Sequence, residues 1–196
     1  MLKSFFFSFI LGSIPFGYII GRLKNIDIQT KGSGNIGATN IHRVLGYQYG
    51  LIVLFLDTLK GAVPCLLLAK VFHSSQLPLV TEQAICGSLA IIGHIWSPFL
   101  KFKGGKGVAT SLGAFIVLSP LGVAFSFAIF LITVFFTRYI SLGSILAAIG
   151  FPIWVYLLKS PKSIFIASIV IATITMLKHK KNIKRLLLKE ENKWRL

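Results

Sequence analysis

A short stretch rich in glycine and lysine, residues 93–107, has the composition of an anion-binding loop. Its central positions are Lys103, Gly104, Gly105, Lys106 and Gly107. Glycines permit positive φ and leave backbone N–H groups uncovered, so the chain can wrap an anion, and the lysines add positive charge. The spacing of a Walker loop is absent. The stretch predicts a phosphate or oxyanion site, and a basic turn held against lipid headgroups is the open alternative.

A second polar stretch, residues 31–43, is rich in glycine together with short side chains that donate and accept hydrogen bonds. Its candidate binding residues are Ser33, Asn35, Gly37, Thr39, Asn40 and Arg43. An arginine can clamp a phosphate with two parallel N–H groups, which a lysine cannot do. The alternative is a flexible surface loop.

Two further candidates lie nearer the C-terminus. His179 and Asn182 are three residues apart, so they share a helical face in the basic stretch 178–192. The alternative for this stretch is a basic end that binds acidic lipid. Ser141 follows Arg138 at the end of an apolar run, where an interfacial anchor with a helix-capping serine is the alternative.

The composition shows what must position these residues. Of the 196 residues, 55% are hydrophobic and only 13% are charged, and the mean hydropathy is +0.80. A soluble domain of this size could not bury so much apolar surface. We therefore expect an all-α integral membrane protein, because a spanning segment must satisfy its own backbone. The net charge of +16 then favours anionic lipid and anionic substrates over nucleic acid as partners.

Seven apolar runs predict seven transmembrane helices. They cover about residues 2–21, 47–72, 79–99, 107–119, 120–137, 140–158 and 161–177. Most approach the roughly 20 residues needed to cross a bilayer, whereas 107–119 predicts a short or tilted helix. The first run resembles a signal peptide but lacks its cleavage pattern, so we interpret it as a first membrane helix. We expect one membrane-embedded domain spanning residues 1–196.

The distribution of positive charge predicts the orientation. With the N-terminus outside, sixteen of the 21 Lys and Arg residues fall on the inner side, including eight in a tail that ends near Arg195. Four fall outside, and Lys60 lies within a span. This asymmetry follows the positive-inside rule. It places the C-terminus and all three polar segments on the cytoplasmic side.

One pair of charges lies inside a predicted span. Asp57 and Lys60 are three residues apart and share a helical face. Charges at this depth are costly, so both should face the bundle interior. A neutralised pair that only spares the membrane cost is favoured over direct chemistry.

Several enzyme classes are excluded by what the sequence lacks. No histidine is followed five positions later by aspartate, as in the common glycerolipid acyltransferases. There is no Gly-x-Ser-x-Gly elbow. With only five acidic residues, a carboxylate pair or a magnesium cluster is not expected. The two cysteines, Cys65 and Cys86, lie in apolar runs and indicate neither a disulfide nor a metal site.

Taken together, the chain resembles the bacterial acyl-phosphate-dependent glycerol-3-phosphate acyltransferase family over essentially its full length. The resemblance rests on residues 32–40 with Arg43, on 93–99 and 102–110, on 179–186, and on the shorter matches at 57–61 and 138–142. It implies an enzyme that transfers the acyl group of a fatty acyl phosphate to the 1-hydroxyl of sn-glycerol 3-phosphate. The products would be lysophosphatidic acid and inorganic phosphate, in the first step of phospholipid synthesis.

The resemblance also implies residue roles, partners and location. It implies catalytic roles for Ser33, Arg43, His179 and Asn182. It implies substrate binding by Asn35, Gly37, Thr39, Asn40, His94, Lys103, Gly104, Gly105, Lys106, Gly107 and Ser141. No cofactor or metal is implied. The soluble phosphate acyltransferase that makes acyl phosphate becomes a candidate partner, and the expected location is the bacterial cytoplasmic (inner) membrane with the active site facing the cytoplasm.

One position departs from the family pattern. Lys189 stands where the family usually has glycine, two residues before Glu191, which takes the place of a structural glutamate.

Two other functions stay open on the residues alone. A phosphate-ester transporter would predict broken spans related by inverted symmetry, which the sequence does not display. A structural lipid-binding protein would not need the Gly-Gly-Lys-Gly spacing.

Overall fold

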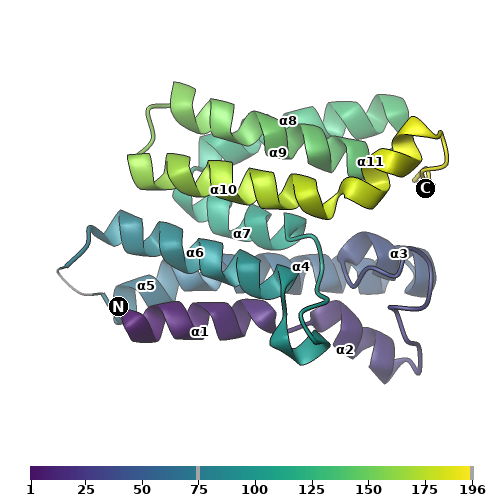
Figure 1. Cartoon of the computed structure of the whole chain (residues 1–196), viewed down its shortest axis with the longest axis horizontal. Helices are drawn as coiled ribbons and strands as arrows, with labels where there is room; N and C mark the ends of the chain where they lie inside the picture. Colours follow the sequence, from purple (N-terminus) through teal and green to yellow (C-terminus); the bar gives the residue numbers. More distant parts are fainter. Residues whose placement is uncertain (74–75, 195–196) are drawn as a thin grey trace. The chain divides into compact units, whose positions relative to one another are not determined.

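The computed structural model describes residues 1–73 and 76–194, and every regular element in those ranges is helical (Figure 1). Arg195, counted above among the tail cations, lies outside the described residues. The helices form two compact units, Met1–Leu118 and Ser119–Leu196. The all-α membrane fold expected from the composition is confirmed.

The first unit is built from the N-terminal helices. Its elements are α1 (Leu2–Ser13), α2 (Phe16–Leu23), α3 (Ala38–Leu45), α4 (Tyr47–Val63), the π-helical turn η1 (Pro64–Leu68), α5 (Ala69–Val71), α6 (Leu79–Ile95), the 3-10 turn η2 (Pro98–Leu100) and α7 (Val108–Leu118). In this unit α1 packs on α6, α4 packs on α7, and α3 packs on α4.

The first span is broken between α1 and α2. Pro15 has no N–H and cannot continue the helical hydrogen-bond ladder. Carbonyl groups freed in this way need donors, because hydrocarbon provides none. The Ser97 hydroxyl donates to the Ser13 carbonyl at 2.7 Å, and the Lys60 ammonium donates to the Ile14 carbonyl at 2.6 Å. The break therefore persists because two later segments of the chain satisfy it.

The α1–α6 contact depends on small residues. Ser4, Ser8 and Gly12 are buried on α1, and a Cβ at Gly12 would overlap the backbone of Ala90 on α6. Small residues let membrane helices approach closely, so that backbone van der Waals contact replaces the missing hydrophobic drive. This contact fixes α6, the helix that leads into the glycine-rich stretch.

The second unit contains the remaining helices. They are α8 (Pro120–Thr137), α9 (Ile140–Leu157), α10 (Lys162–Lys178) and α11 (Lys180–Leu187). Helix α9 packs on α8 and α10. A bend of 56° separates α10 from α11. The tail folds back on this unit, because the Trp194 N–H donates to the Arg138 carbonyl at 2.7 Å.

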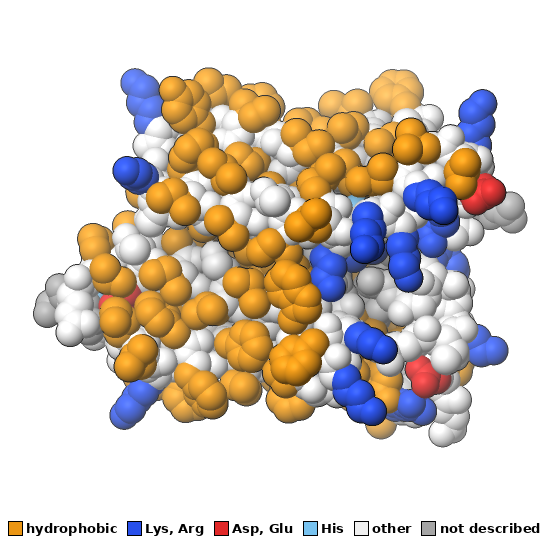
Figure 2. Space-filling view, in the orientation of Figure 1, with side chains coloured by type: hydrophobic (Ala, Val, Ile, Leu, Met, Phe, Trp, Pro, Cys, Tyr) orange, Lys and Arg blue, Asp and Glu red, His pale blue; other side chains and the backbone are white. Residues whose placement is uncertain are grey.

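Five described segments are long and apolar enough to cross a membrane: Leu2–Leu23, Tyr47–Val71, Leu79–Leu100, Pro120–Thr137 and Ile140–Leu157. The bent pair α10–α11 is a sixth if it forms one span. They coincide closely with the predicted runs. The 107–119 run forms α7, whose 11 residues extend about 16 Å at 1.5 Å per residue, too short to cross alone. The exact number of seven spans and the orientation stay predictions, as does the single domain. Figure 2 shows hydrophobic side chains over the long faces of the helices and Lys and Arg toward their ends.

Replacement of Gly12 by alanine should force α1 away from α6. Overpacking of this kind costs about 1–3 kcal/mol, so the apparent Tm of the detergent-solubilised protein should fall. Gly150→Ala in α9 is the matched control, since its Cβ would meet side chains and no backbone: Ile129 Cδ1 at 3.1 Å and Trp154 Nε1 at 3.5 Å. If the Tm of Gly12→Ala falls by no more than that of Gly150→Ala, the close packing of α1 on α6 is contradicted.

Candidate functional site

The glycine-rich loop closes the end of α6. The Gly104 N–H donates to the Ile95 carbonyl at 3.2 Å, and the Gly105 N–H donates to the His94 carbonyl at 3.0 Å. A Cβ at Gly104 would overlap the His94 carbonyl oxygen, and one at Gly105 would overlap His94 Nε2. The expectation that these two N–H groups are uncovered is therefore wrong, because the last carbonyls of α6 need donors. The glycines are required by close backbone packing.

The end of the same loop opens toward α7. Gly107 has a φ of +85°, and its carbonyl accepts the first bond of α7 from the Ser111 N–H at 2.7 Å. A helix N-terminus attracts negative charge. Lys103 is exposed and Lys106 is half-buried, so the loop presents positive charge beside this helix end.

The residue 31–43 loop is organised by Asn40. This buried amide accepts from the Ser33 N–H at 2.7 Å, and donates to the carbonyls of Lys31 at 3.1 Å and Asn35 at 2.8 Å. Both ends of the Asn40 side chain are thus used inside the loop. This geometry gives Asn40 a positioning role, and the substrate binding that the family resemblance implies for it stays a prediction.

Local turns complete the shape of this loop. Gly32 and Gly34 have φ of +59° and +71°, and a Cβ at Gly32 would overlap Asn40 Oδ1. The Asn35 carboxamide accepts from the Gly37 N–H at 2.8 Å, which shapes the entry to α3. Asn35 and Gly37 therefore position α3 and the residues that it carries.

Three side chains of this loop project outward. Ser33, Thr39 and Arg43 are exposed. Within residues 1–73 and 76–194, none of the three side chains has a hydrogen-bond or ion-pair partner. Thr39 and Arg43 are four residues apart on α3 and share a face. A hydroxyl, a second hydroxyl and a guanidinium are thus available to an anionic ligand.

The two loops lie side by side. The Gln29 side-chain amide, two residues before the residue 31–43 loop, donates to the Lys103 carbonyl of the glycine-rich loop at 3.3 Å. Gln29 lies outside every motif, so no sequence pattern indicated this contact. The contact brings the Ser33–Arg43 segment and the glycine-rich loop together within the first unit.

A buried charge cluster lies within this unit. Asp57 and Lys60 are each 2% exposed, as the sequence predicts for interior charges, and their side chains form an ion pair at 2.7 Å. His94 Nδ1 lies 3.6 Å from Asp57 Oδ1. His94 is only 4% exposed. It packs between Asp57 and Gly105, a position suited to holding the loop in place, and its predicted contact with substrate stays a prediction.

The remaining predicted site residues belong to the second unit. His179 is buried, and its Nδ1 lies 2.8 Å from the Thr175 carbonyl. Because a carbonyl only accepts, Nδ1 carries the hydrogen, and in the neutral ring Nε2 is the nitrogen that can take a proton. Ser141 is buried in the first turn of α9, whose capping position is Tyr139, so the helix-capping alternative for Ser141 is wrong.

Glu191 ties the tail together. It accepts from Asn182 at 2.9 Å and from Arg185 at 2.7 Å. Lys189, where the family usually has glycine, lies two residues after the end of α11 and has a φ of +58°. The Glu190 N–H donates to the Arg185 carbonyl. This is the left-handed helix end that glycine normally provides. The departure from the family pattern therefore leaves the turn intact.

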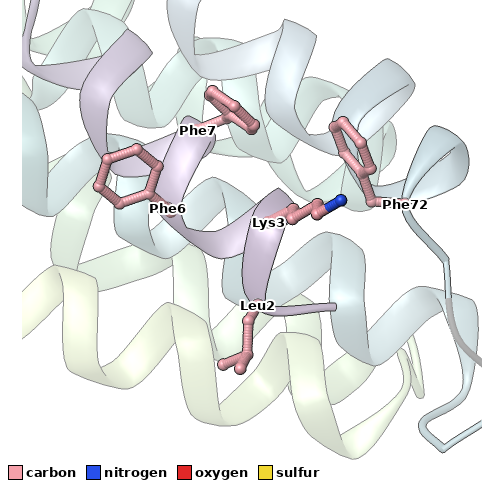
Figure 3. Close-up of a pocket in the computed structure, with 5 residues that line it drawn as sticks. All are labelled: Leu2, Lys3, Phe6, Phe7 and Phe72. Atoms are coloured by element: carbon pink, nitrogen blue, oxygen red, sulfur yellow. The ribbon is translucent and has the colours of Figure 1, made fainter.

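The apolar groove in Figure 3 is a separate feature. It is lined by Leu2, Lys3, Phe6, Phe7 and Phe72. These residues lie at the start of α1 and after α5, away from the loop that closes α6. In the described part of the chain, no group of three or more His, Cys, Asp or Glu side chains could hold a metal ion.

Long apolar helices with anion-suited loops at their ends define an integral membrane protein that crosses the bilayer several times. Comparison with known proteins gives the family. The family model described as glycerol-3-phosphate acyltransferase matches residues 2–189, and this chain belongs to that family.

Curated relatives and a solved structure agree. The chain is 43% identical to a glycerol-3-phosphate acyltransferase of Desulfotalea psychrophila over 96% of this chain and 95% of that protein. It is 46% identical to glycerol-3-phosphate acyltransferase 2 of Bacillus anthracis over 95% of each. The crystal structure of PlsY (YgiH), an integral membrane glycerol 3-phosphate acyltransferase in its glycerol 3-phosphate form, is 39% identical, with a TM-score of 0.92 over 99% of this chain and 95% of that one.

Loss of the Glu191 charge should loosen the tail. Although burial raises the pKa of Glu191, hydrogen bonds from Arg185 and Asn182 outweigh it and hold the pKa below its ordinary value of 4.5. The stabilisation is therefore present above that ordinary value and is lost as pH falls through the lowered pKa of the folded state.

We expect Glu191→Gln to lower the apparent Tm at pH 7 by about 2–4 °C, the shift for roughly 1 kcal/mol in a chain of this size. Its further loss of Tm on acidification should be smaller than that of the parent protein. The exposed neighbour variant Glu190→Gln is the control. Parallel curves of Tm against pH for the parent protein and Glu191→Gln would contradict a stabilising role for the Glu191 charge.

Proposed function

We propose that this glycerol-3-phosphate acyltransferase uses a fatty acyl phosphate as donor and forms 1-acyl-sn-glycerol 3-phosphate (lysophosphatidic acid) and inorganic phosphate. The observation that carries the proposal is the pairing of two loops that present Ser33, Arg43 and Lys103 outward. Both substrates are phosphate esters or anhydrides, so both need cationic and N–H partners. Structures of PlsY in a glycerol 3-phosphate form and a lysophosphatidic acid form support the acceptor and the product.

The residues favour direct acyl transfer. An acyl phosphate already carries a good leaving group, so no covalent enzyme intermediate is required. The 1-hydroxyl oxygen of glycerol 3-phosphate attacks the acyl carbonyl carbon, the bond from that carbon to the phosphate oxygen breaks, and the hydroxyl proton passes to the departing phosphate. The loops hold two anions together, which supplies proximity and stabilises developing charge.

In the first unit, the proposed residue roles follow from exposure. We propose Ser33 and Arg43 as catalytic residues, with Thr39, Lys103 and Lys106 as substrate contacts beside them. Asn35, Gly37, Asn40, His94, Gly104, Gly105 and Gly107 shape the loops that carry these contacts. In the second unit, His179 and Asn182 are kept as proposed catalytic residues and Ser141 as a proposed substrate contact.

The setting of the reaction is also a proposal. Seven spans with the N-terminus outside would put the polar loops on the cytoplasmic face of the bacterial inner membrane. Glycerol 3-phosphate and acyl phosphate would both arrive from that side. The soluble phosphate acyltransferase that makes acyl phosphate is the partner that this arrangement suits.

Donor identity can be tested directly. Purified protein should release phosphate and lysophosphatidic acid in equal amounts from palmitoyl phosphate and glycerol 3-phosphate, and should give no product from palmitoyl-CoA. Arg43→Ala should reduce kcat/KM by about 10- to 10²-fold, since a charged hydrogen bond contributes roughly 1.5–3 kcal/mol. Lys31→Ala, which removes an exposed cation from the same loop, is the control and should keep its activity. Turnover of palmitoyl-CoA alone, or equal losses in both variants, would refute the proposal.

The proton acceptor can be tested through His179. If the proton passes to the departing phosphate, the residual activity of His179→Ala should keep the pH profile of the parent enzyme. If His179 is instead the general base, the acidic limb of the kcat profile should disappear in the variant. A lost limb would replace direct transfer with general-base catalysis.

A further inference from the structure

The buried cluster of Asp57, Lys60 and His94 links the two polar loops. Lys60 donates to the Ile14 carbonyl at 2.6 Å, at the break from which α2 leads into the Ser33–Arg43 segment. His94 lies at the other end, with Nε2 so close to Gly105 that no Cβ fits there. Asp57 lies between them, 2.7 Å from Lys60 Nζ and 3.6 Å from His94 Nδ1. One chain of contacts therefore runs from the broken span to the glycine-rich loop.

Charge neutralisation alone does not account for this arrangement. A buried ion pair can often be replaced by apolar residues without loss of stability. The Lys60 ammonium, however, also satisfies the Ile14 carbonyl at the Pro15 break and lies 5.5 Å from the centre of the Phe16 ring. An apolar side chain would leave that carbonyl without this donor.

We propose that Asp57, Lys60 and His94 are positioning residues, which fix the glycine-rich loop relative to the Ser33–Arg43 segment through a buried network within the first unit. Lys60 holds the break in the first span, His94 supports the glycine-rich loop, and Asp57 couples the two. The importance of this network for catalysis rests on the proposed function. The coupling between the two loops is a structural property, which a distance measurement tests without substrate.

Two double variants separate positioning from charge compensation. Asp57→Asn/Lys60→Met removes both charges and the donor to Ile14, whereas Asp57→Asn/Lys60→Gln removes both charges and keeps a donor. Spin labels at Lys31→Cys and Lys101→Cys, both exposed positions outside the proposed binding residues, would report the distance between the loops. The background would be Cys65→Ala/Cys86→Ala, since these buried thiols are the chain's two cysteines.

Pulsed dipolar spectroscopy should give a narrow distance distribution for the parent protein and the Gln variant, and a broadened or shifted one for the Met variant. In unlabelled enzyme, kcat/KM should fall by about 10- to 10²-fold in the Met variant, as expected for misplaced loops, with partial recovery in the Gln variant. Parent-like distances in both folded variants would overturn the proposal and leave charge compensation as the only role. If the Met variant fails to fold, a broadened distribution in the Gln variant overturns it as well.

Glu82→Gln is the matched control. Glu82 is a fully buried carboxylate on α6 that pairs with His73 at 3.2 Å, near the start of the helix. Neutralising Glu82 should leave the distance between the loops and kcat/KM at parent values. A broadened distance distribution in Glu82→Gln would show that any change of buried charge disturbs the loops, and this would also overturn the proposal. Absence of turnover in the parent enzyme would refute the proposed function alone, because the distance measurement needs no substrate.

Discussion

The need to satisfy backbone carbonyls inside an apolar environment governs the first unit. Pro15 breaks the first span, and the freed carbonyls of Ser13 and Ile14 find donors in Ser97 and Lys60. Without those donors the Ser13 carbonyl would lose the Ser97 hydroxyl, and the Ile14 carbonyl would keep only the Phe16 N–H, at 3.2 Å. A polar group left unsatisfied in hydrocarbon costs several kcal/mol. The break interrupts the hydrogen-bond ladder of the span Leu2–Leu23, and α2 leads on into the first polar loop. A proline that would weaken a simple membrane helix is thus part of how the site is built.

The same constraint shapes the glycine-rich loop. The last carbonyls of α6 are closed by the N–H groups of Gly104 and Gly105, so the loop is fixed before any ligand arrives. Preorganised loops lose little entropy on binding, and an enzyme that works by holding two anions together depends on that rigidity. The exposed Ser33, Thr39 and Arg43 stand on a segment fixed equally firmly by Asn40. Rigid backbone and outward-facing polar side chains are therefore combined in one unit.

The sequence predicted the helices well and the roles of individual polar residues less well. The apolar runs coincide closely with the helices, and the spacing of Asp57 and Lys60 correctly predicted a buried pair. Periodicity did not reveal the break at Pro15, because a proline near the middle of a membrane span is compatible with a continuous helix. The N–H groups of Gly104 and Gly105 and the contacts of Asn40, His94 and Gln29 are tertiary, and composition cannot assign a partner many residues away. Lys189 departs from the family's glycine, yet it adopts the positive φ that the turn requires, which the residue type did not predict.

Calorimetric titration of the purified protein with glycerol 3-phosphate, beside glycerol, tests most directly whether the polar loops bind a phosphate ester. The account predicts saturable binding of glycerol 3-phosphate that weakens with added salt, competition by inorganic phosphate, and no binding of glycerol. Equal binding of glycerol and glycerol 3-phosphate, or binding that phosphate and salt leave unchanged, would contradict it.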